Sequence, residues 1–279
     1  MKVKKQRVDV LLVERGLMET REKAKRAVMA GLVYSKEERL DKPGEKVKED
    51  IDLTIKGNVM PYVSRGGYKL EKALEVFDVN VENKILLDIG SSTGGFTDCA
   101  LQNGATRSYA LDVGYNQLAW KLRQDERVIV MERTNFRYVK PEDLESGVPQ
   151  IASIDVSFIS LTLILPVLKT LLSSSGDVIA LIKPQFEAGK DQVGKKGIVR
   201  EPKIHNEVIE KIIRFSLKEG YDVVGLSYSP IKGGEGNIEF LVHLFWTGDK
   251  ETGDLRLTKT IDAVVEEAHA ELKIRKEEE

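Results

Sequence analysis

The succession of apolar segments after residue 84 constrains the fold more than any other feature of this sequence. Seven short apolar segments follow one another, and helix-length stretches separate the first six. Strands that alternate with helices predict a parallel sheet covered by helices on both faces. We expect seven strands, at residues 85–90, 108–114, 128–132, 151–157, 177–183, 222–229 and 238–245, and helices at 94–104, 116–125, 141–145, 160–174 and 201–220.

The connection between the last two predicted strands differs from the others because it is short. Only the segment PIKGGEGN (230–237) joins them. A parallel return needs a crossover of about a dozen residues or more, so the last strand must run antiparallel to its neighbours. An α/β sheet with an antiparallel last strand is typical of the Rossmann-like class I fold of methyltransferases that use S-adenosylmethionine (SAM), and not of the NAD-binding fold.

Residues 1–59 have a different pattern, which predicts a small α+β domain. Two short helices are expected, VDVLLVERG (8–16) and TREKAKRAVMAG (20–31). Each ends at a glycine, and Thr20 is the expected N-cap of the second. Short strands are expected in LVYS (32–35) and DLTIKG (52–57), around a polar turn.

The segment NVMPYVSRGGYKLEKALEVF (58–77) joins the two parts of the chain. Pro61 and the pair Gly66–Gly67 interrupt it, and a helix is expected to follow them. We therefore predict a small domain at 1–59, a linker at 60–66 and a large domain at 67–279.

Charge is unevenly distributed along the chain. The net charge is −2, yet residues 1–30 hold nine basic and four acidic side chains. On composition alone, a solvated helix pair and a surface that docks on an RNA backbone are about equally good interpretations. The candidate RNA-binding residues are Lys4, Lys5, Arg7, Arg21, Lys23, Lys25 and Arg26, together with Arg65 in the joining segment.

Other function classes receive little support from the sequence. The single cysteine, Cys99, excludes an internal disulfide and suits a reducing compartment. The three histidines are scattered and give no zinc spacing, so no metal site is expected. The longest apolar stretch, 161–172, contains Pro166 and Lys169 and is too short to cross a bilayer. We expect a cytoplasmic protein.

The segment LLDIGSSTGGFTDCAL (86–101) predicts a strand, a turn of small residues and the start of a helix. A tight turn in any α/β protein would look similar. It does not match the dinucleotide motif GxGxxG, because Ser92 stands where the second glycine would approach a pyrophosphate. The candidate cofactor residues of this loop are Gly90, Ser91, Ser92, Thr93, Gly94, Gly95 and Phe96.

Polar side chains at the ends of the first three strands favour SAM over NAD. Asp88 would repel a pyrophosphate but attract the ammonium of a methionine moiety. Asp112 ends the second strand, where an acid binds ribose hydroxyls, and Val113 can pack on adenine. After the third strand, Asn135 can reach the edge of the adenine and Phe136 can form a wall.

The fourth, fifth and seventh strands bring charged residues to the same edge of the predicted sheet. Asp155 ends the fourth strand, Lys183 ends the fifth, and Glu239 begins the antiparallel seventh. Such a cluster over a SAM site suits methylation of a ribose hydroxyl. Lys183 could act as a neutral base with a lowered pKa, or as a charged group that orients the hydroxyl and stabilises the developing alkoxide.

The motifs SRGGYKLEKAL, LDIGSSTGGFTDCALQNGA, DVSFISL, LIKPQFEAG and GNIEF resemble the FtsJ-like RNA 2′-O-methyltransferases, and most closely the TlyA family, whose members often carry the name hemolysin. The resemblance implies a catalytic tetrad of Lys69, Asp155, Lys183 and Glu239. Lys69 enters through the resemblance alone. The N-terminal segment RVDVLLVERGLMETREKAKRAVMAGLVY (7–34) is similar to the S4-type RNA-binding domain.

The predicted function is therefore 2′-O-methylation of ribosomal RNA with SAM as cofactor, and the resemblance implies cytidine as the target. Two alternatives remain. One is a hemolysin that acts on membranes, although the terminal segment 261–279 is strongly acidic. The other is a ribosome-binding assembly factor without catalysis.

Overall fold

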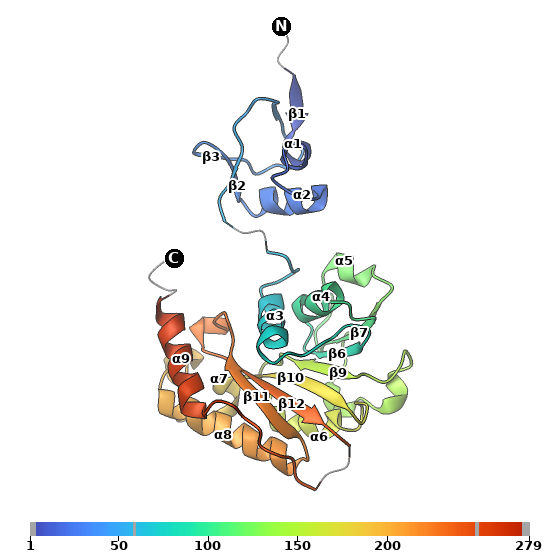
Figure 1. The fold of residues 1–279 in the computed structure, drawn as a ribbon, viewed down its shortest axis with the longest axis vertical. Helices are drawn as coiled ribbons and strands as arrows, with labels where there is room; N and C mark the ends of the chain where they lie inside the picture. Colours follow the sequence, from blue (N-terminus) through green and yellow to red (C-terminus); the bar gives the residue numbers. More distant parts are fainter. Residues whose placement is uncertain (1–3, 58–59, 249–250, 275–279) are drawn as a thin grey trace. The chain divides into compact units, whose positions relative to one another are not determined.

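A computed structural model of the chain describes residues 4–57, 60–248 and 251–274. The chain divides into two compact units, residues 1–61 and 62–279 (Figure 1). The predicted linker at 60–66 spans this division, and Gly66 is already the first residue of helix α3.

The first unit packs two short helices against small antiparallel sheets. Its elements are β1 (Lys5–Arg7), α1 (Val8–Glu14), α2 (Arg21–Met29), β2 (Val33–Ser35), β3 (Glu38–Arg39), β4 (Lys46–Lys48) and β5 (Thr54–Ile55). Both predicted helices are confirmed, and the hydroxyl of Thr20 accepts a hydrogen bond of 3.2 Å from the Lys23 amide. The segment between the two predicted strands was expected to be a polar turn. This prediction was wrong in part, because β3 and β4 form there. Strand β4 pairs with β1, and β3 pairs with β2.

The second unit is built on a sheet of seven strands in the order β11-β12-β10-β9-β6-β7-β8. The strands are β6 (Ile85–Ile89), β7 (Arg107–Leu111), β8 (Val128–Met131), β9 (Ile151–Ile154), β10 (Gly176–Ile182), β11 (Asp222–Tyr228) and β12 (Phe240–Trp246). Strand β12 lies between β10 and β11 and is antiparallel to both. The predicted Rossmann-like methyltransferase topology is confirmed.

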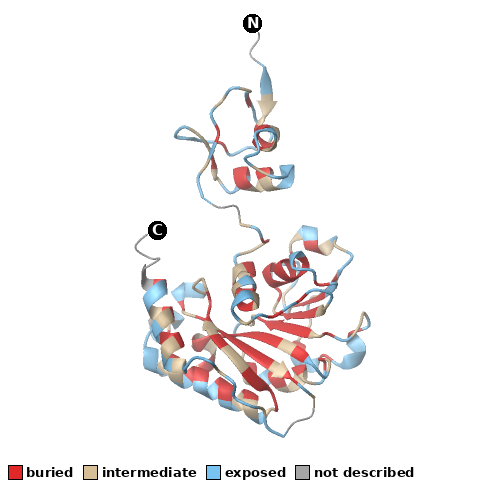
Figure 2. Cartoon of the chain, in the orientation of Figure 1, coloured by how far each residue is buried: buried red, intermediate tan, exposed pale blue. Residues whose placement is uncertain are grey.

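Helices cover both faces of this sheet (Figure 1). Helices α3 (Gly66–Val76), α4 (Gly95–Gln102) and α5 (Trp120–Arg123) share one core with alternate strand residues such as Leu86 and Ile179. Helices α6 (Leu165–Leu168), α8 (Pro202–Lys218) and α9 (Ile261–Ile274) share the other core with Leu87 and Val178. Figure 2 shows the strands as the most continuously buried part of the unit, as expected for a sheet covered on both sides.

Two predicted helices were too long. Residues 160–174 form the 3₁₀ turn η3 (Leu161–Leu163) and the short α6, because Pro166 has no amide hydrogen to continue a helix through this point. In the segment 116–125, Asn116 has a left-handed φ of 60°, and the helix begins only at Trp120. The expected helix near 141–145 is the 3₁₀ turn η2 (Pro141–Asp143).

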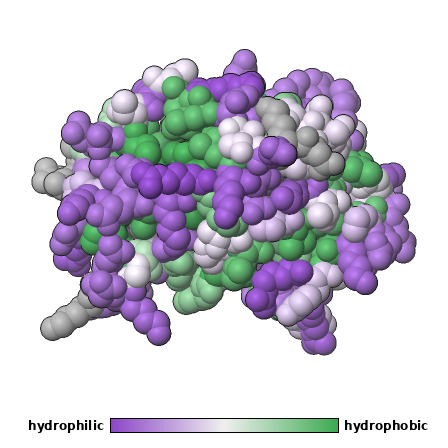
Figure 3. All heavy atoms as spheres, turned by 90° about the horizontal axis from the view of Figure 1, so that it is seen from below, coloured by the Kyte–Doolittle hydropathy of each residue, from purple (hydrophilic) through white to green (hydrophobic). Residues whose placement is uncertain are grey.

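The outer surface of the helices is mixed in character. Seen from below, hydrophilic side chains form broad bands with apolar patches between them (Figure 3). Across the described ranges 4–57, 60–248 and 251–274, no helix combines the length and the apolar character that a membrane span requires.

A pair of histidines joins α8 to α9. His205 is fully buried, its Nε2 lies 3.2 Å from the Val199 carbonyl oxygen, and its Nδ1 lies 3.0 Å from His269 Nε2. Because a carbonyl only accepts, His205 Nε2 carries the proton and Nδ1 accepts from His269. Burial, and the neighbouring His269, lower the pKa of His205 to about 4. His205 is therefore neutral in the folded protein.

This neutral histidine predicts a loss of stability in acid. The folded pKa of about 4 lies below the ordinary 6.5, so its contribution is complete above 6.5 and is lost as the pH falls toward 4. The loss amounts to at most about 3 kcal/mol. Urea unfolding between pH 7.5 and 4.5 should show a weaker pH dependence for His205→Gln than for the unchanged protein. Equal slopes for the two proteins would show that another group is responsible.

Candidate active site

A cleft of about 360 Å³ opens at the carboxyl edge of the large sheet. This size falls in the range of small-molecule sites. Five segments that are distant in sequence form its walls: the start of α3, the loop after β6, the ends of β9 and β10, and the connection from β11 to β12. The lining residues are Ser64, Arg65, Gly66, Lys69, Asp88, Gly90, Ser91, Ser92, Thr93, Gly95, Phe96, Asp155, Ser157, Lys183, Ile231, Lys232, Gly233, Gly234 and Glu239.

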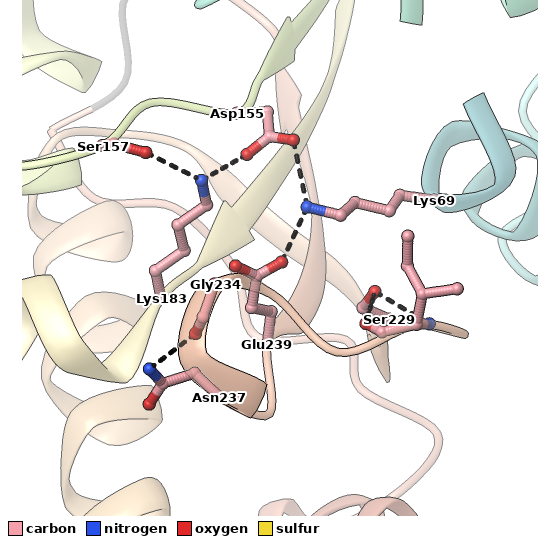
Figure 4. Close-up of polar contacts among 9 residues, drawn as sticks. Lys69, Asp155, Ser157, Lys183, Ser229, Gly234, Asn237 and Glu239 are labelled. Carbon is pink, nitrogen blue, oxygen red and sulfur yellow. Dashed lines mark hydrogen bonds and ion pairs between the residues drawn. The ribbon is translucent and has the colours of Figure 1, made fainter. Parts of the chain in front are cut away.

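Two lysines and two carboxylates form a continuous chain of ion pairs in this cleft (Figure 4). Lys69 Nζ lies 2.7 Å from Glu239 Oε2 and 3.1 Å from Asp155 Oδ2. The other oxygen of Asp155, Oδ1, lies 2.5 Å from Lys183 Nζ. The structure thus brings together all four residues that the sequence analysis placed in a tetrad.

The pairing fixes the charge states of at least two of these groups. Burial alone would lower the pKa of Lys69, but the carboxylates of Asp155 and Glu239 outweigh it and raise that pKa. Burial would raise the pKa of Asp155, but Lys69 and Lys183 lower it. Lys69 is therefore an ammonium and Asp155 a carboxylate at neutral pH.

Glycine and asparagine residues position Glu239. Gly233 lies so close that a Cβ atom there would stand 2.0 Å from Glu239 Oε1, so any other residue would displace the carboxylate from its present position. Asn237 is almost fully buried and donates from Nδ2 to the carbonyl oxygens of Gly197 and Gly234, at 2.9 and 3.1 Å. Its Oδ1 accepts from the Val199 amide at 3.0 Å. The connection from β11 to β12 is thereby tied to residues 197–199.

The loop after β9 presents a hydroxyl and an aromatic ring. Lys183 Nζ donates to Ser157 Oγ at 3.3 Å. The next residue, Phe158, is 90% exposed and has a left-handed φ of 63°, a conformation that costs a bulky residue energy. Its ring lies 4.9 Å from that of Phe186, in the short helix α7 (Pro184–Glu187). Glu187 fastens this loop by accepting from Ser160 Oγ at 2.6 Å and from the Leu161 amide at 2.7 Å.

The glycines of the predicted cofactor loop allow close backbone packing. Gly90 has a φ of 85°, and a Cβ atom there would lie 2.7 Å from the Asp155 carbonyl oxygen. A Cβ at Gly95 would lie 2.3 Å from Ser64 Oγ and 2.8 Å from the Gly67 nitrogen. Gly94 has a φ of 96° and leads into α4. The loop therefore packs closely against the segment that follows β9 and against the start of α3.

Asp88 lies at the inner end of the cleft and is fully buried. Its Oδ2 accepts from the Thr97 amide and hydroxyl at 3.1 and 2.8 Å, and its Oδ1 accepts from Ser153 Oγ at 2.8 Å. Burial raises the pKa of Asp88 to about 6 in spite of these hydrogen bonds. Since a nearby cation would lower this pKa again, the environment of Asp88 suits a positively charged ligand group.

Asp112, Val113, Asn135 and Phe136 were also predicted to bind the cofactor. None of these four is among the described residues that line the cleft. Asp112 accepts from the amides of Ser92 and Gly114, at 2.8 and 2.7 Å. Val113 is 70% exposed, and Asn135 accepts from the Arg137 amide at 3.2 Å. Phe136 is packed in the main core. The hydrogen bonds of Asp112 link the end of β7 to the glycine-rich loop, whereas the position of Phe136 gives it a packing role.

Comparison with protein families decides the class of the second unit. The model of the FtsJ-like methyltransferase family matches residues 62–246, and that of the S4 domain matches residues 6–50. The chain belongs to the FtsJ-like methyltransferase family.

Relatives of this FtsJ-like methyltransferase align along nearly the whole chain. The "Putative rRNA methyltransferase YqxC" of Bacillus subtilis is 68% identical over 98% of this chain and 97% of its own length. The "16S/23S rRNA (cytidine-2'-O)-methyltransferase TlyA" of Mycobacterium tuberculosis is 39% identical over 94% and 97%. A solved structure, "Putative hemolysin from Streptococcus thermophilus", is 55% identical, covers 99% of both chains and superposes with a TM-score of 0.75.

The predicted RNA-binding residues of the FtsJ-like methyltransferase fall into two groups. Arg65 lines the cleft at the start of α3. The other seven lie in the first unit, where Lys23 pairs with Glu19 and Lys25 pairs with Glu22 on the surface of α2. Sequence reasoning missed Ser157 and Phe158, although both belong to the motif DVSFISL directly after a buried strand, which is where an α/β sheet places its ligand-binding residues.

The central position of Lys69 predicts a large loss of stability when its charge is removed. Lys69→Met leaves the carboxylates of Asp155 and Glu239 facing each other without their shared ammonium. We expect the free energy of unfolding in urea to fall by about 3 kcal/mol.

Two further variants test the cause of that loss. Asp155 keeps its pair with Lys183, so Glu239 is the carboxylate that Lys69→Met leaves unpaired. Adding Glu239→Gln removes that charge and should recover part of the stability. Lys259→Met, which breaks an exposed pair with Glu267, should cost less than about 1 kcal/mol. An equal loss for Lys69→Met and Lys259→Met would contradict the central role of Lys69.

Proposed function

We propose that this protein transfers a methyl group from S-adenosylmethionine to the 2′-hydroxyl of a ribose in ribosomal RNA. The observation that carries the proposal is the position of Lys183, whose side-chain Nζ lies in the same cleft as the glycine-rich loop. Its neighbours there are Asp155 at 2.5 Å and Ser157 at 3.3 Å. A ribose hydroxyl that enters this cleft would meet a basic group held by a carboxylate.

The cleft fits the proposed cofactor in its chemistry. The buried carboxylate of Asp88, with its pKa raised to about 6, would attract the ammonium of the methionine moiety. Residues 90–96 would contact the ligand through backbone and hydroxyl groups, and Asp112 would accept from its ribose hydroxyls. Val113 and Asn135 would lie beside the adenine, while Phe136 would support this end of the site from within the core.

Lys183 is better suited than Lys69 to act on the substrate. Lys69 is held between two carboxylates and its pKa is raised, which makes it a poor base. Lys183 pairs with one carboxylate and a neutral hydroxyl. Lys69 and Glu239 therefore position Asp155, and Asp155 directs Lys183 toward the ribose.

The transfer needs the removal of one proton. SAM, when bound, supplies a methyl group on a sulfonium, which leaves as a thioether when the new oxygen–carbon bond forms. The 2′-hydroxyl loses its proton to the amine of Lys183 if that amine is neutral. If Lys183 is an ammonium, it stabilises the developing alkoxide and the proton passes to solvent.

The first unit would supply the affinity for folded RNA. Its basic residues on β1 and α2 can neutralise phosphates, and Arg65 would extend contact to the rim of the cleft. Cytidine is the proposed target, because the TlyA relative is named as a cytidine-2′-O-methyltransferase. We place the reaction in the cytoplasm, where ribosomal RNA is modified.

Replacing Lys183 tests the proposed chemistry. With tritiated SAM and unmethylated ribosomal subunits, Lys183→Ala should transfer methyl groups about 100-fold more slowly or worse. Lys203→Ala, at a side chain that is 84% exposed, is the matched control and should keep the normal rate. Each methylated position should appear as a phosphodiester bond resistant to alkali, because a methylated 2′-oxygen cannot attack the adjacent phosphate. Normal transfer by Lys183→Ala would refute the assigned role.

The exposed ring of Phe158 predicts a contact with the target base. Stacking on an aromatic ring contributes about 1–3 kcal/mol per base. Phe158→Ala should therefore lower kcat/KM for ribosomal RNA about 10-fold or more, and Phe158→Trp should restore most of it. Similar losses in both variants, with unchanged unfolding curves, would argue against stacking.

A further inference from the structure

The first unit holds a buried carboxylate between two of the predicted RNA-binding arginines. Asp9 Oδ1 accepts from Arg7 Nε at 2.9 Å. Its Oδ2 accepts from Nη2 of Arg7 and from Nη2 of Arg21, both at 3.0 Å. Three side chains from β1, α1 and α2 therefore form one hydrogen-bonded group.

Burial in this group is strongly asymmetric. The side chain of Asp9 is 0% exposed, whereas those of Arg7 and Arg21 are 43% and 54% exposed. The acid lies beneath the surface and both guanidinium groups reach it. Hydrogen bonding from Arg7, and then from Arg21, lowers the pKa of Asp9 to about 2 against the effect of burial, so it is ionised at any physiological pH.

Other basic side chains of the unit are paired differently. Lys23 and Lys25 pair with Glu19 and Glu22, whose side chains are 79% and 74% exposed. Such pairs in water are weak and do not fix a side chain. Arg15 donates to the carbonyl oxygens of Glu49 and Ile51, which ties the end of α1 to the segment after β4.

Arg7 binds Asp9 through two parallel hydrogen bonds, from Nε and from Nη2. This bidentate geometry orients the plane of the Arg7 guanidinium more closely than a single contact would. Gly44 lies beside the guanidinium, since a Cβ atom there would stand 3.4 Å from Arg7 Cζ.

We propose that Asp9 is a positioning residue that holds Arg7 and Arg21 as a paired donor site for a phosphate of the RNA backbone. The inference rests on the proposed function, because it deepens the role of the first unit in RNA binding. One buried anion beneath two cations leaves a local charge of +1. Each guanidinium has five N–H donors, so both keep donors beyond those given to Asp9. Fixing two flexible arginines in advance reduces the entropy lost when the phosphate binds.

The variant Asp9→Asn distinguishes positioning of the arginines by Asp9 from a purely electrostatic effect of the Asp9 charge. The substitution removes a negative charge beside a phosphate site, so charge alone predicts tighter binding of RNA. Loss of positioning predicts weaker binding. We expect Kd for unmethylated ribosomal subunits to rise about 5- to 10-fold, and the effect in methyl transfer to fall on KM for RNA more than on kcat.

Asp41→Asn is the matched control, since Asp41 also pairs with an arginine, Arg39, at 2.6 Å, but both side chains are 56% exposed. It should leave Kd unchanged or slightly lower. In an Arg7→Ala/Arg21→Ala background, Asp9→Asn should have no further effect. Binding by Asp9→Asn that equals or exceeds normal binding would overturn the proposal, as would an undiminished loss in that background.

If Asp9→Asn unfolds the first unit, the double variant Arg7→Lys/Arg21→Lys tests the proposal instead. It keeps both charges but removes the planar donors, and it should weaken binding by a similar factor. Normal binding by this variant would overturn the proposal. Failure of the unchanged protein to bind ribosomal subunits or to methylate them would instead refute the proposed function itself.

Discussion

Each oxygen of the Asp155 carboxylate lies within ion-pair distance of a lysine Nζ, that of Lys69 on one side and that of Lys183 on the other. Asp155 follows β9, Lys183 follows β10, and Lys69 belongs to α3, which precedes the first strand of the sheet. The fourth member, Glu239, reaches the same place only because β12 runs antiparallel and therefore begins where the parallel strands end. The connectivity of the chain therefore determines which charged residues reach the cleft, because a parallel β12 would carry Glu239 to the opposite edge of the sheet.

The cost of burying these charges explains why the surrounding backbone is so restricted. Lys69, Lys183 and Glu239 are each less than a tenth exposed, and an unpaired charge at such a position would be strongly destabilising. Pairing offsets this cost only when the geometry is maintained. Gly233 allows the Glu239 carboxylate to lie against the main chain, and Gly90 allows the loop after β6 to approach the Asp155 carbonyl. These two glycines therefore support the charged network through close packing.

The sequence predicted the large sheet, the succession of its strands and helices along the chain and its antiparallel last strand, because apolar runs and connection lengths are local properties. It also placed Asp155, Lys183 and Glu239 at one edge, because strand ends follow from topology. Lys69 could not be derived in this way, since it lies on helix α3, before the first strand of the sheet, and not at a strand end. The exposed Phe158 was missed for a related reason: its left-handed backbone leaves no mark on hydrophobic periodicity.

Both units pair carboxylates with basic side chains, but in different ratios. In the cleft, two acids face two lysines, so their formal charges balance. At Asp9, one acid faces two arginines, so a positive excess remains at the surface. For the proposed methyl transfer, this balance would place the substrate hydroxyl in a site without a large excess charge. For the proposed phosphate site, the positive excess at Asp9 would attract the ligand, so the ratio of acids to bases separates the two proposed roles.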